Sequence, residues 1–98
     1  MHKQIKEPVD VFLKWKTAIN GLEKRLAPYC LVWNDRLVEF ELLGCIRKAN
    51  VEAGISGLRY TIRLHNKHNA TYRDTFLYLD GDSIETGKWF VVKQYPNH

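Results

Sequence analysis

The residues most able to do chemistry lie at positions 59–76, in the stretch RYTIRLHNKHNATYRDTF. It holds three arginines, a lysine and two histidines three positions apart. Guanidinium groups bind phosphate and carboxylate through paired hydrogen bonds, and imidazoles bind metals or transfer protons. The stretch is therefore a candidate anion-binding surface, metal site or catalytic strand pair.

The two histidines do not predict a metal site. His65 and His68 have no cysteine near them, and a zinc site needs three or four ligands. Residues 80–85 are too few for a calcium-binding loop and lack its series of ligands. Cys30 and Cys45 lie outside any CxxC spacing and beside no histidine. We expect two reduced packing cysteines, no metal and no cofactor.

The composition is that of an ordinary globular domain. Of 98 residues, 45% are hydrophobic and 27% are charged, which excludes a disordered chain. Two separate cores would be too small at this length, so residues 1–98 are expected to form a single domain. No apolar run approaches the roughly 18 residues of a membrane span, and the first ten residues lack the apolar centre of a signal peptide. We therefore expect a cytoplasmic protein that binds no membrane.

The net charge of +4 is unevenly distributed along the chain. Residues 47–73 hold six basic residues against Glu52 alone, whereas residues 74–98 hold two lysines against four acidic residues. A concentration of one sign attracts partners of the opposite sign. We expect an anionic partner, either nucleic acid or an acidic protein surface.

The N-terminal third predicts an amphipathic helix at about 8–27. Pro8 suits the first helical turn, and Pro28 ends the helix. Apolar residues at spacings of three, four or one form a single stripe, namely Val11, Phe12, Trp15, Ile19, Leu22 and Leu26. We expect this stripe to pack on one face of a sheet.

The rest of the chain predicts an antiparallel meander of about four to five strands, which gives an α+β fold. A hairpin around Asn34 and Asp35 places Leu31 opposite Val38. Residues 36–49 also fit a helix capped at one of these turn residues, although the alternation of apolar and acidic residues favours strands. The expected strands cover about 29–34, 37–46, 57–65, 71–79 and 88–95.

The third and fourth of these strands are expected to join through a three-residue loop at 67–69. This register sets Arg63 directly opposite Arg73, places Arg59 on the same face and turns Asp74 towards the apolar face. Like charges facing each other across strands destabilise a sheet by about 0.2–1 kcal/mol. An acidic residue of a neighbouring strand or an external anion must therefore balance the arginines.

We expect a small non-enzymatic binding protein that engages its anionic partner through this basic sheet face. Stoichiometric inhibitors of phages or mobile elements are of this kind. The predicted binding residues are Arg59, Arg63, His65, Lys67, Arg73, Arg47 and Lys48. The simpler interpretation is a structural sheet face that Glu39 or Glu41 neutralises from the next strand.

The alternative function is a small metal-independent ribonuclease of toxin type. His65 or His68, Glu39 or Glu41 and an arginine would then supply the base, the acid and the cation. The predicted order, a helix followed by a basic meander, loosely resembles RelE-type toxins. The chain lacks their strand before the helix and their catalytic signature, so no residue role is carried over, and an enzyme is the weaker expectation.

The last predicted strand, WFVVKQY, has apolar residues on both of its faces. Such a strand at a sheet edge can pair with a second copy of the chain, so the sequence leaves a homodimer open. Lys88 and Lys93 oppose that pairing, since lysines on an edge strand discourage it.

Overall fold

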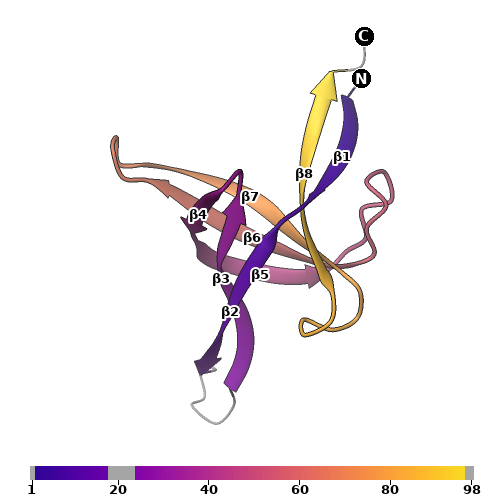
Figure 1. The fold of residues 1–98 in the computed structure, drawn as a ribbon, viewed down its shortest axis with the longest axis horizontal. Helices are drawn as coiled ribbons and strands as arrows, with labels where there is room; N and C mark the ends of the chain where they lie inside the picture. Colours follow the sequence, from indigo (N-terminus) through magenta and orange to yellow (C-terminus); the bar gives the residue numbers. More distant parts are fainter. Residues whose placement is uncertain (1, 18–23, 97–98) are drawn as a thin grey trace.

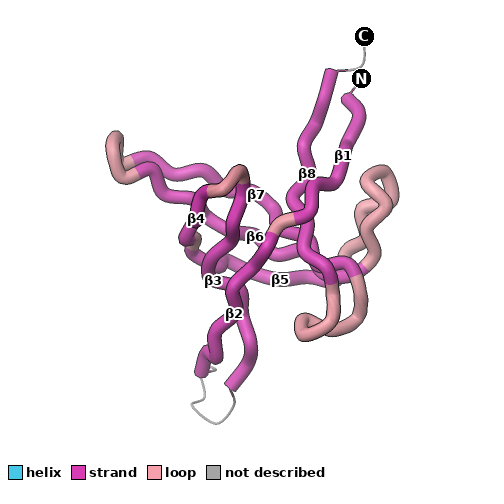
Figure 2. Tube along the Cα trace, viewed as in Figure 1, coloured by secondary structure: helices cyan, strands magenta, loops and turns pink. Residues whose placement is uncertain are grey.

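The computed structural model of the protein describes residues 2–17 and 24–96 (Figures 1 and 2). These residues form strands, turns and loops, and among them no helix exists that could span a membrane. The strands are β1 (His2–Pro8), β2 (Asp10–Thr17), β3 (Lys24–Trp33), β4 (Arg36–Glu39), β5 (Glu41–Arg47), β6 (Gly57–Asn66), β7 (Thr71–Asp80) and β8 (Lys88–Pro96).

Two bent strands join the two antiparallel sheets into a ring. One sheet has the order β1-β8-β7-β6-β5 and the other has the order β2-β3-β4. β1 continues into β2 at Val9, whose N–H donates to the Trp89 carbonyl at 3.1 Å. β4 continues into β5 at Phe40, whose N–H donates to the Tyr29 carbonyl at 3.2 Å. If β1–β2 and β4–β5 are each taken as one bent strand, every strand pairs with the next along the chain and β8 pairs with β1, as in an up-and-down barrel.

The ring is open along one seam, between β7 and β8. These strands pair only where Tyr78–Asp80 meets Lys88–Phe90. Past this point β8 continues with β1, and the first half of β7 stays with β6, so the two pairs diverge (Figure 1). β8 lies between β1 and β7, so it is not at a sheet edge where a second copy could pair with it.

The main core fills the interior of the ring. Ile62, Leu77 and Leu79 are at most 1% exposed, and the rings of Tyr60 and Trp89 lie 5.3 Å apart. Burying aromatic and aliphatic side chains of this size is the dominant stabilising contribution in a small domain. The core therefore holds the inner faces of β6, β7 and β8 in place.

A second cluster lies on the outside of the five-stranded sheet. There the loop between β5 and β6 packs Ala53 and Ile55 against Tyr78 and Phe90. Asn50 and Ile55 close this loop with a backbone hydrogen bond in each direction, at 2.8 and 2.9 Å. The loop therefore covers part of the outer face of β7 and β8.

The predicted N-terminal helix at 8–27 is wrong, because its described residues lie at the end of β1, at Val9 and in β2 and β3. The fold is all-β rather than α+β, so the likeness in element order to RelE-type toxins falls with the helix. Val9, Val11 and Leu13 pack against the core from alternate positions, as strand residues do. Phe12 lies on the other face and is 46% exposed, so an apolar residue interrupts the alternation in the sequence. Residues 18–23 of the predicted helix lie outside the described residues.

The antiparallel pairing of strands and the first short hairpin are confirmed, but the strands form two sheets, and the predicted strand at 37–46 is divided into β4 and β5. Leu31 pairs with Val38 around Asn34 and Asp35, as the sequence predicted. Both turn residues have positive φ, 52° and 59°, which a two-residue turn of type I′ requires. β4 and β5 therefore replace the alternative helix at 36–49.

The predicted register of the β6–β7 hairpin is wrong by one residue. Asn66 pairs with Thr71, so the loop has four residues, 67–70. Ala70, with φ of 54°, takes the left-handed position in place of Asn69. The Asn66 and Asn69 side chains each accept the backbone N–H two residues further on, which builds two local turns into the loop.

Candidate functional site

The outer face of the β6–β7 hairpin carries two arginine–aromatic pairs. The guanidinium carbon of Arg59 lies 4.1 Å from the centre of the Phe76 ring, and that of Arg63 lies 4.1 Å from the centre of the Tyr72 ring. The two aromatic residues are 41% and 60% exposed. A guanidinium that rests on a ring keeps its N–H edge for a second partner. The face therefore combines cations with accessible aromatic surface.

Arg63 is neutralised within this face by Asp74. The observed register sets the two residues opposite each other, and Arg63 donates from Nε and Nη2 to the two carboxylate oxygens at 2.8 and 3.1 Å. The hydrogen bonds lower the pKa of Asp74 below its ordinary value and raise the pKa of Arg63. The expectation that Asp74 lies on the apolar face is wrong, and Arg63 is balanced by an acid of the hairpin itself rather than of a neighbouring strand.

Glu41 of β5 reaches the same face. Its Oε2 lies 3.4 Å from Nε2 of His65, and both side chains are more than half exposed. The other acid considered, Glu39, lies in the three-stranded sheet opposite Cys30. Among the described residues, no three His, Cys, Asp or Glu side chains converge on a metal position. The face is thus partly balanced by its own acids, as the simpler interpretation holds.

Arg59 is the cation of this face that has no carboxylate partner among the described residues. Its Nε is buried and has no hydrogen-bond partner there. A buried polar atom without a partner is uncommon. Beside it, Lys48 and Phe76 line an open hollow of about 550 Å³ on the outer face of the sheet. Arg59 and Lys48 are therefore the cations best placed for an external anion.

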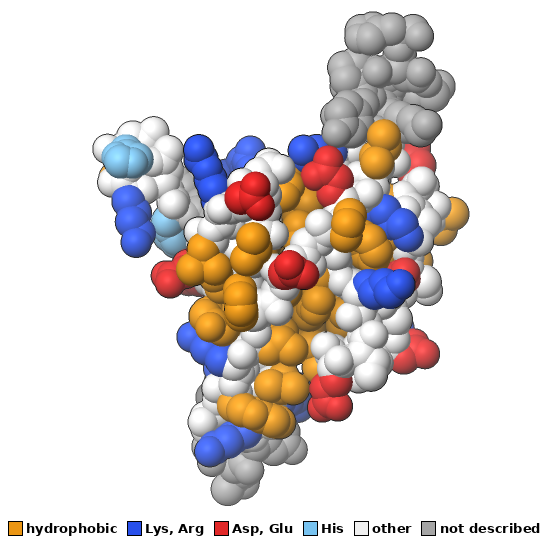
Figure 3. Space-filling view, in the orientation of Figure 1, with side chains coloured by type: hydrophobic (Ala, Val, Ile, Leu, Met, Phe, Trp, Pro, Cys, Tyr) orange, Lys and Arg blue, Asp and Glu red, His pale blue; other side chains and the backbone are white. Residues whose placement is uncertain are grey.

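Two of the predicted binding residues lie away from this face. Lys67 is exposed in the loop at the tip of the hairpin, where Figure 3 shows basic and histidine side chains together. Arg47 lies at the end of β5, and its Nη1 is 4.0 Å from Asp82, with both side chains largely exposed. Neither residue contributes to the arginine–aromatic pairs.

Arg73 also leaves the predicted face. It pairs with Leu64, so its side chain belongs to the inner side of the hairpin, towards the seam. Of the predicted set, the structure brings together Arg59, Arg63 and His65, with Lys48 nearby.

Sequence reasoning missed Phe76 as a stacking partner. The predicted three-residue loop puts Phe76 on the side of the sheet opposite Arg63 and Arg73. A four-residue loop would have placed Phe76 and Tyr72 on the face of the arginines. The sequence therefore contained the information that places Phe76 beside the arginines, but using it required the correct loop length.

Comparison with known proteins assigns no family to this chain. No protein-family model matches it, and neither the curated proteins nor the solved structures gave a match. The function is therefore argued from the geometry of its own residues.

Proposed function

We propose that the protein is a small non-enzymatic binding protein that holds single-stranded nucleic acid on the outer face of the β6–β7 hairpin. The observation that carries this proposal is the pair of exposed arginine–aromatic contacts at 4.1 Å. Bases stack on aromatic side chains with about 1–3 kcal/mol each and without sequence preference. Guanidinium groups beside the rings bind phosphate oxygens.

The charge distribution supports the same partner. The net charge of +4 arises mainly between residues 47 and 73, which include β6 and the loop before it. Because Arg63 forms an ion pair with Asp74, Arg59 and Lys48 are the two expected phosphate contacts. Each contact with a single strand contributes about −0.7 to the slope of log K against log salt. Two contacts give a slope of about −1.4.

Fluorescence anisotropy with labelled oligo-dT and oligo-U, at several salt concentrations, tests this proposal. Arg59→Gln is expected to weaken binding and to reduce the salt slope by about 0.7. Phe76→Leu is expected to cost about 1–3 kcal/mol of binding free energy at unchanged slope. Arg36→Gln, which removes an exposed cation from the three-stranded sheet, is the matched control and should alter neither.

Two outcomes contradict the proposal. The first is no binding of either oligonucleotide at low salt. The second is equal loss in Arg59→Gln and Arg36→Gln, which assigns binding to net charge alone. If the protein instead binds an acidic protein, and oligonucleotides do not compete with that binding, the partner is a protein and not nucleic acid.

The ribonuclease alternative rests on the contact between His65 and Glu41, next to Arg63. A general base and a general acid must reach opposite sides of the scissile phosphate. Here the two groups lie 3.4 Å from each other, which leaves no room for a phosphate between them. Electrophoresis of the same oligo-U after incubation tests this function. Cleavage that His65→Gln abolishes would establish the nuclease in place of the binding protein.

We also propose a cytoplasmic location. The two cysteines support it because Cys30 and Cys45 are both free thiols, as is usual in a reducing compartment. Alkylation of intact cells followed by mass spectrometry tests the location, since oxidised or externally labelled thiols would contradict it.

A further inference from the structure

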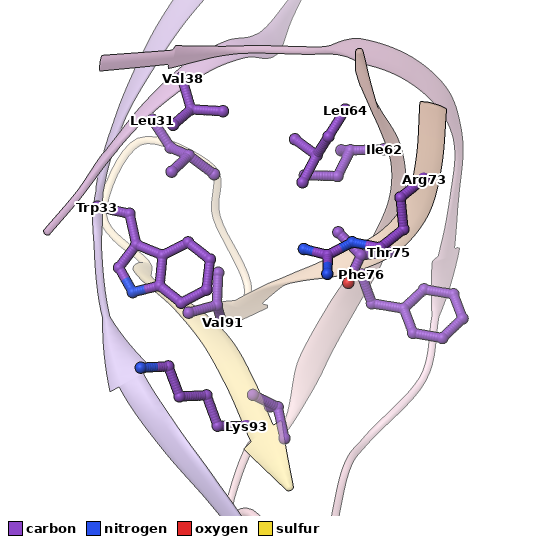
Figure 4. A pocket seen from close by; sticks show the side chains of 11 residues that line it. Leu31, Trp33, Val38, Ile62, Leu64, Arg73, Thr75, Phe76, Val91 and Lys93 are labelled. Carbon is purple, nitrogen blue, oxygen red and sulfur yellow. The ribbon is translucent and has the colours of Figure 1, made fainter. Parts of the chain in front are cut away.

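The seam between β7 and β8 opens into a pocket inside the ring (Figure 4). The pocket has a volume of about 300 Å³. Strands of both sheets supply its apolar lining, which includes Leu31, Trp33, Val38, Ile62, Leu64 and Val91. A hollow of this size, with mostly apolar walls and few polar groups, is typical of a small-molecule site.

Arg73 supplies a charge to this pocket. The register that sets it opposite Leu64 turns its side chain to the inner side of β7. Its guanidinium points into the pocket, towards the wall that holds Trp33 and Val91, while the Phe76 ring points away (Figure 4). Within the described part of the chain, the Arg73 side chain forms no ion pair or hydrogen bond. The guanidinium therefore retains all its donors for a ligand.

The second cation of the pocket, Lys93, is already balanced. Its Nζ lies 3.1 Å from Oε1 of Glu7 and 5.1 Å from the centre of the Trp33 ring. The other oxygen of Glu7 accepts a hydrogen bond from the indole N–H of Trp33 at 3.2 Å. These contacts hold the indole as a wall of the pocket. Arg73 is thus the lining cation without a counter-charge among the described residues.

We propose that this pocket binds a small carboxylate with an apolar body. The carboxylate accepts the paired N–H groups of Arg73, and the body packs against Leu31, Trp33 and Ile62. At about 30 Å³ for each non-hydrogen atom, the share of a water molecule in the liquid, the volume holds about ten atoms. That is about the size of octanoate.

Phe76 borders both the pocket and the outer face, but the arginines of the two sites are different residues. Arg73 and Arg59 lie on opposite sides of the hairpin, so each can be changed without altering the contacts of the other. The inference does not depend on nucleic-acid binding, and either proposal can fail alone.

Isothermal titration calorimetry with octanoate, octanol and octylamine tests the pocket. The three probes share one apolar body and differ in charge. Octanoate is expected to bind most tightly, and Arg73→Gln to weaken octanoate by at least about tenfold while leaving octanol unchanged. Arg73→Lys, which keeps the charge and loses the planar fork, should restore part of the affinity. Arg36→Gln is the control for a change of net charge.

Nuclear magnetic resonance locates the ligand. The indole N–H signal of Trp33 is expected to shift on adding octanoate, whereas that of Trp15, 64% exposed on β2, stays in place. Thermal unfolding of Arg73→Gln shows whether the variant is folded, and its exposed position predicts that it is. The proposal is overturned if octanoate does not bind the wild type, if Arg73→Gln binds it equally well, or if octylamine binds as tightly.

Discussion

Gly57, at the start of β6, is a position where one added methyl group should disrupt the ring. Its φ is 157°, and a Cβ there would lie 2.1 Å from the Leu79 carbonyl oxygen and 2.8 Å from that of Gly81. Gly57 also pairs with Asp80 and accepts the N–H of Lys48 at 3.0 Å. Gly57→Ala therefore pushes the start of β6 away from the end of β7. The same movement weakens the hydrogen bond between Gly57 and Lys48, which anchors the loop before β6.

The size of the effect follows from these distances. An ordinary carbon–oxygen contact is about 3.3 Å, so the backbone near Leu79 must move by about 1.2 Å from the 2.1 Å position. Backbone strain costs about 1–3 kcal/mol, and each lost hydrogen bond costs about 0.5–1.5 kcal/mol. With two hydrogen bonds weakened, we expect Gly57→Ala to lower the free energy of unfolding by about 2–6 kcal/mol. The Tm should fall by at least about 8 °C.

Gly54→Ala is the matched control, because it makes the same chemical change three residues away. Gly54 has a φ of 73°, and nothing lies within 4 Å of the position of its Cβ. Only the left-handed backbone is penalised, by about 1–2 kcal/mol. Urea unfolding, followed by tryptophan fluorescence, compares the two variants with the wild type. If Gly57→Ala loses no more stability than Gly54→Ala, the close approach of β6 to Leu79 is refuted.

Three further substitutions test the core and the ion pair on the outer face. Ile62→Ala removes a side chain that is 1% exposed and should cost about 2–5 kcal/mol in urea unfolding; a cost below about 1 kcal/mol would contradict its burial. Because Arg63 lowers the pKa of Asp74, the stability from this carboxylate is present above its unfolded pKa of about 3.9 and is lost as the pH falls through the lower folded value. The Tm of Asp74→Asn should therefore lie below that of the wild type near pH 6 and converge with it towards about pH 2, and a constant gap would disprove the linkage. Burial against Trp89 raises the pKa of Tyr60, so ionisation of the unfolded chain lowers stability above about pH 10. As the pH rises above about 10, the urea midpoint of Tyr60→Phe should therefore fall less than that of the wild type. An equal fall would contradict a buried neutral phenol.

The sequence predicted β3–β4 pairing correctly because its signals were local. Asn34 and Asp35 tolerate positive φ, and the apolar alternation around Leu31 and Val38 allows only one pairing. Turn chemistry and strand period agreed with each other here. Where two such local preferences agree, the register can be read without the structure.

The N-terminal region failed because one sequence fitted two periods. Val9, Val11 and Leu13 alternate as strand residues, but Phe12 and Trp15 complete a helical stripe with Val11. The structure resolves this through partners that lie far along the chain, since β1 is hydrogen-bonded to β8. Tertiary pairing of this kind is not visible in a short window of sequence.

The candidate site depended on a single loop residue. With three residues in the loop, Arg63 faces Arg73; with four, it faces Asp74, and Arg73 turns towards the pocket. The cross-strand pairing of opposite charges favours the second register, and this energetic preference could have been weighed from the sequence. The pocket itself could not, because its lining comes from both sheets.

The pairing of β1 with β8 also governs the order in which this chain can assemble. During synthesis, β2, β3 and β4 can pair with one another as soon as these adjacent segments have left the ribosome. β1 can pair only after β8 has been synthesised. Closing a loop of this length carries the largest entropic cost of any contact in the ring. Until that step, the inner faces of β1 and β2 remain accessible to water and to chaperones. The ring is thus complete only when β1 and β8 have paired.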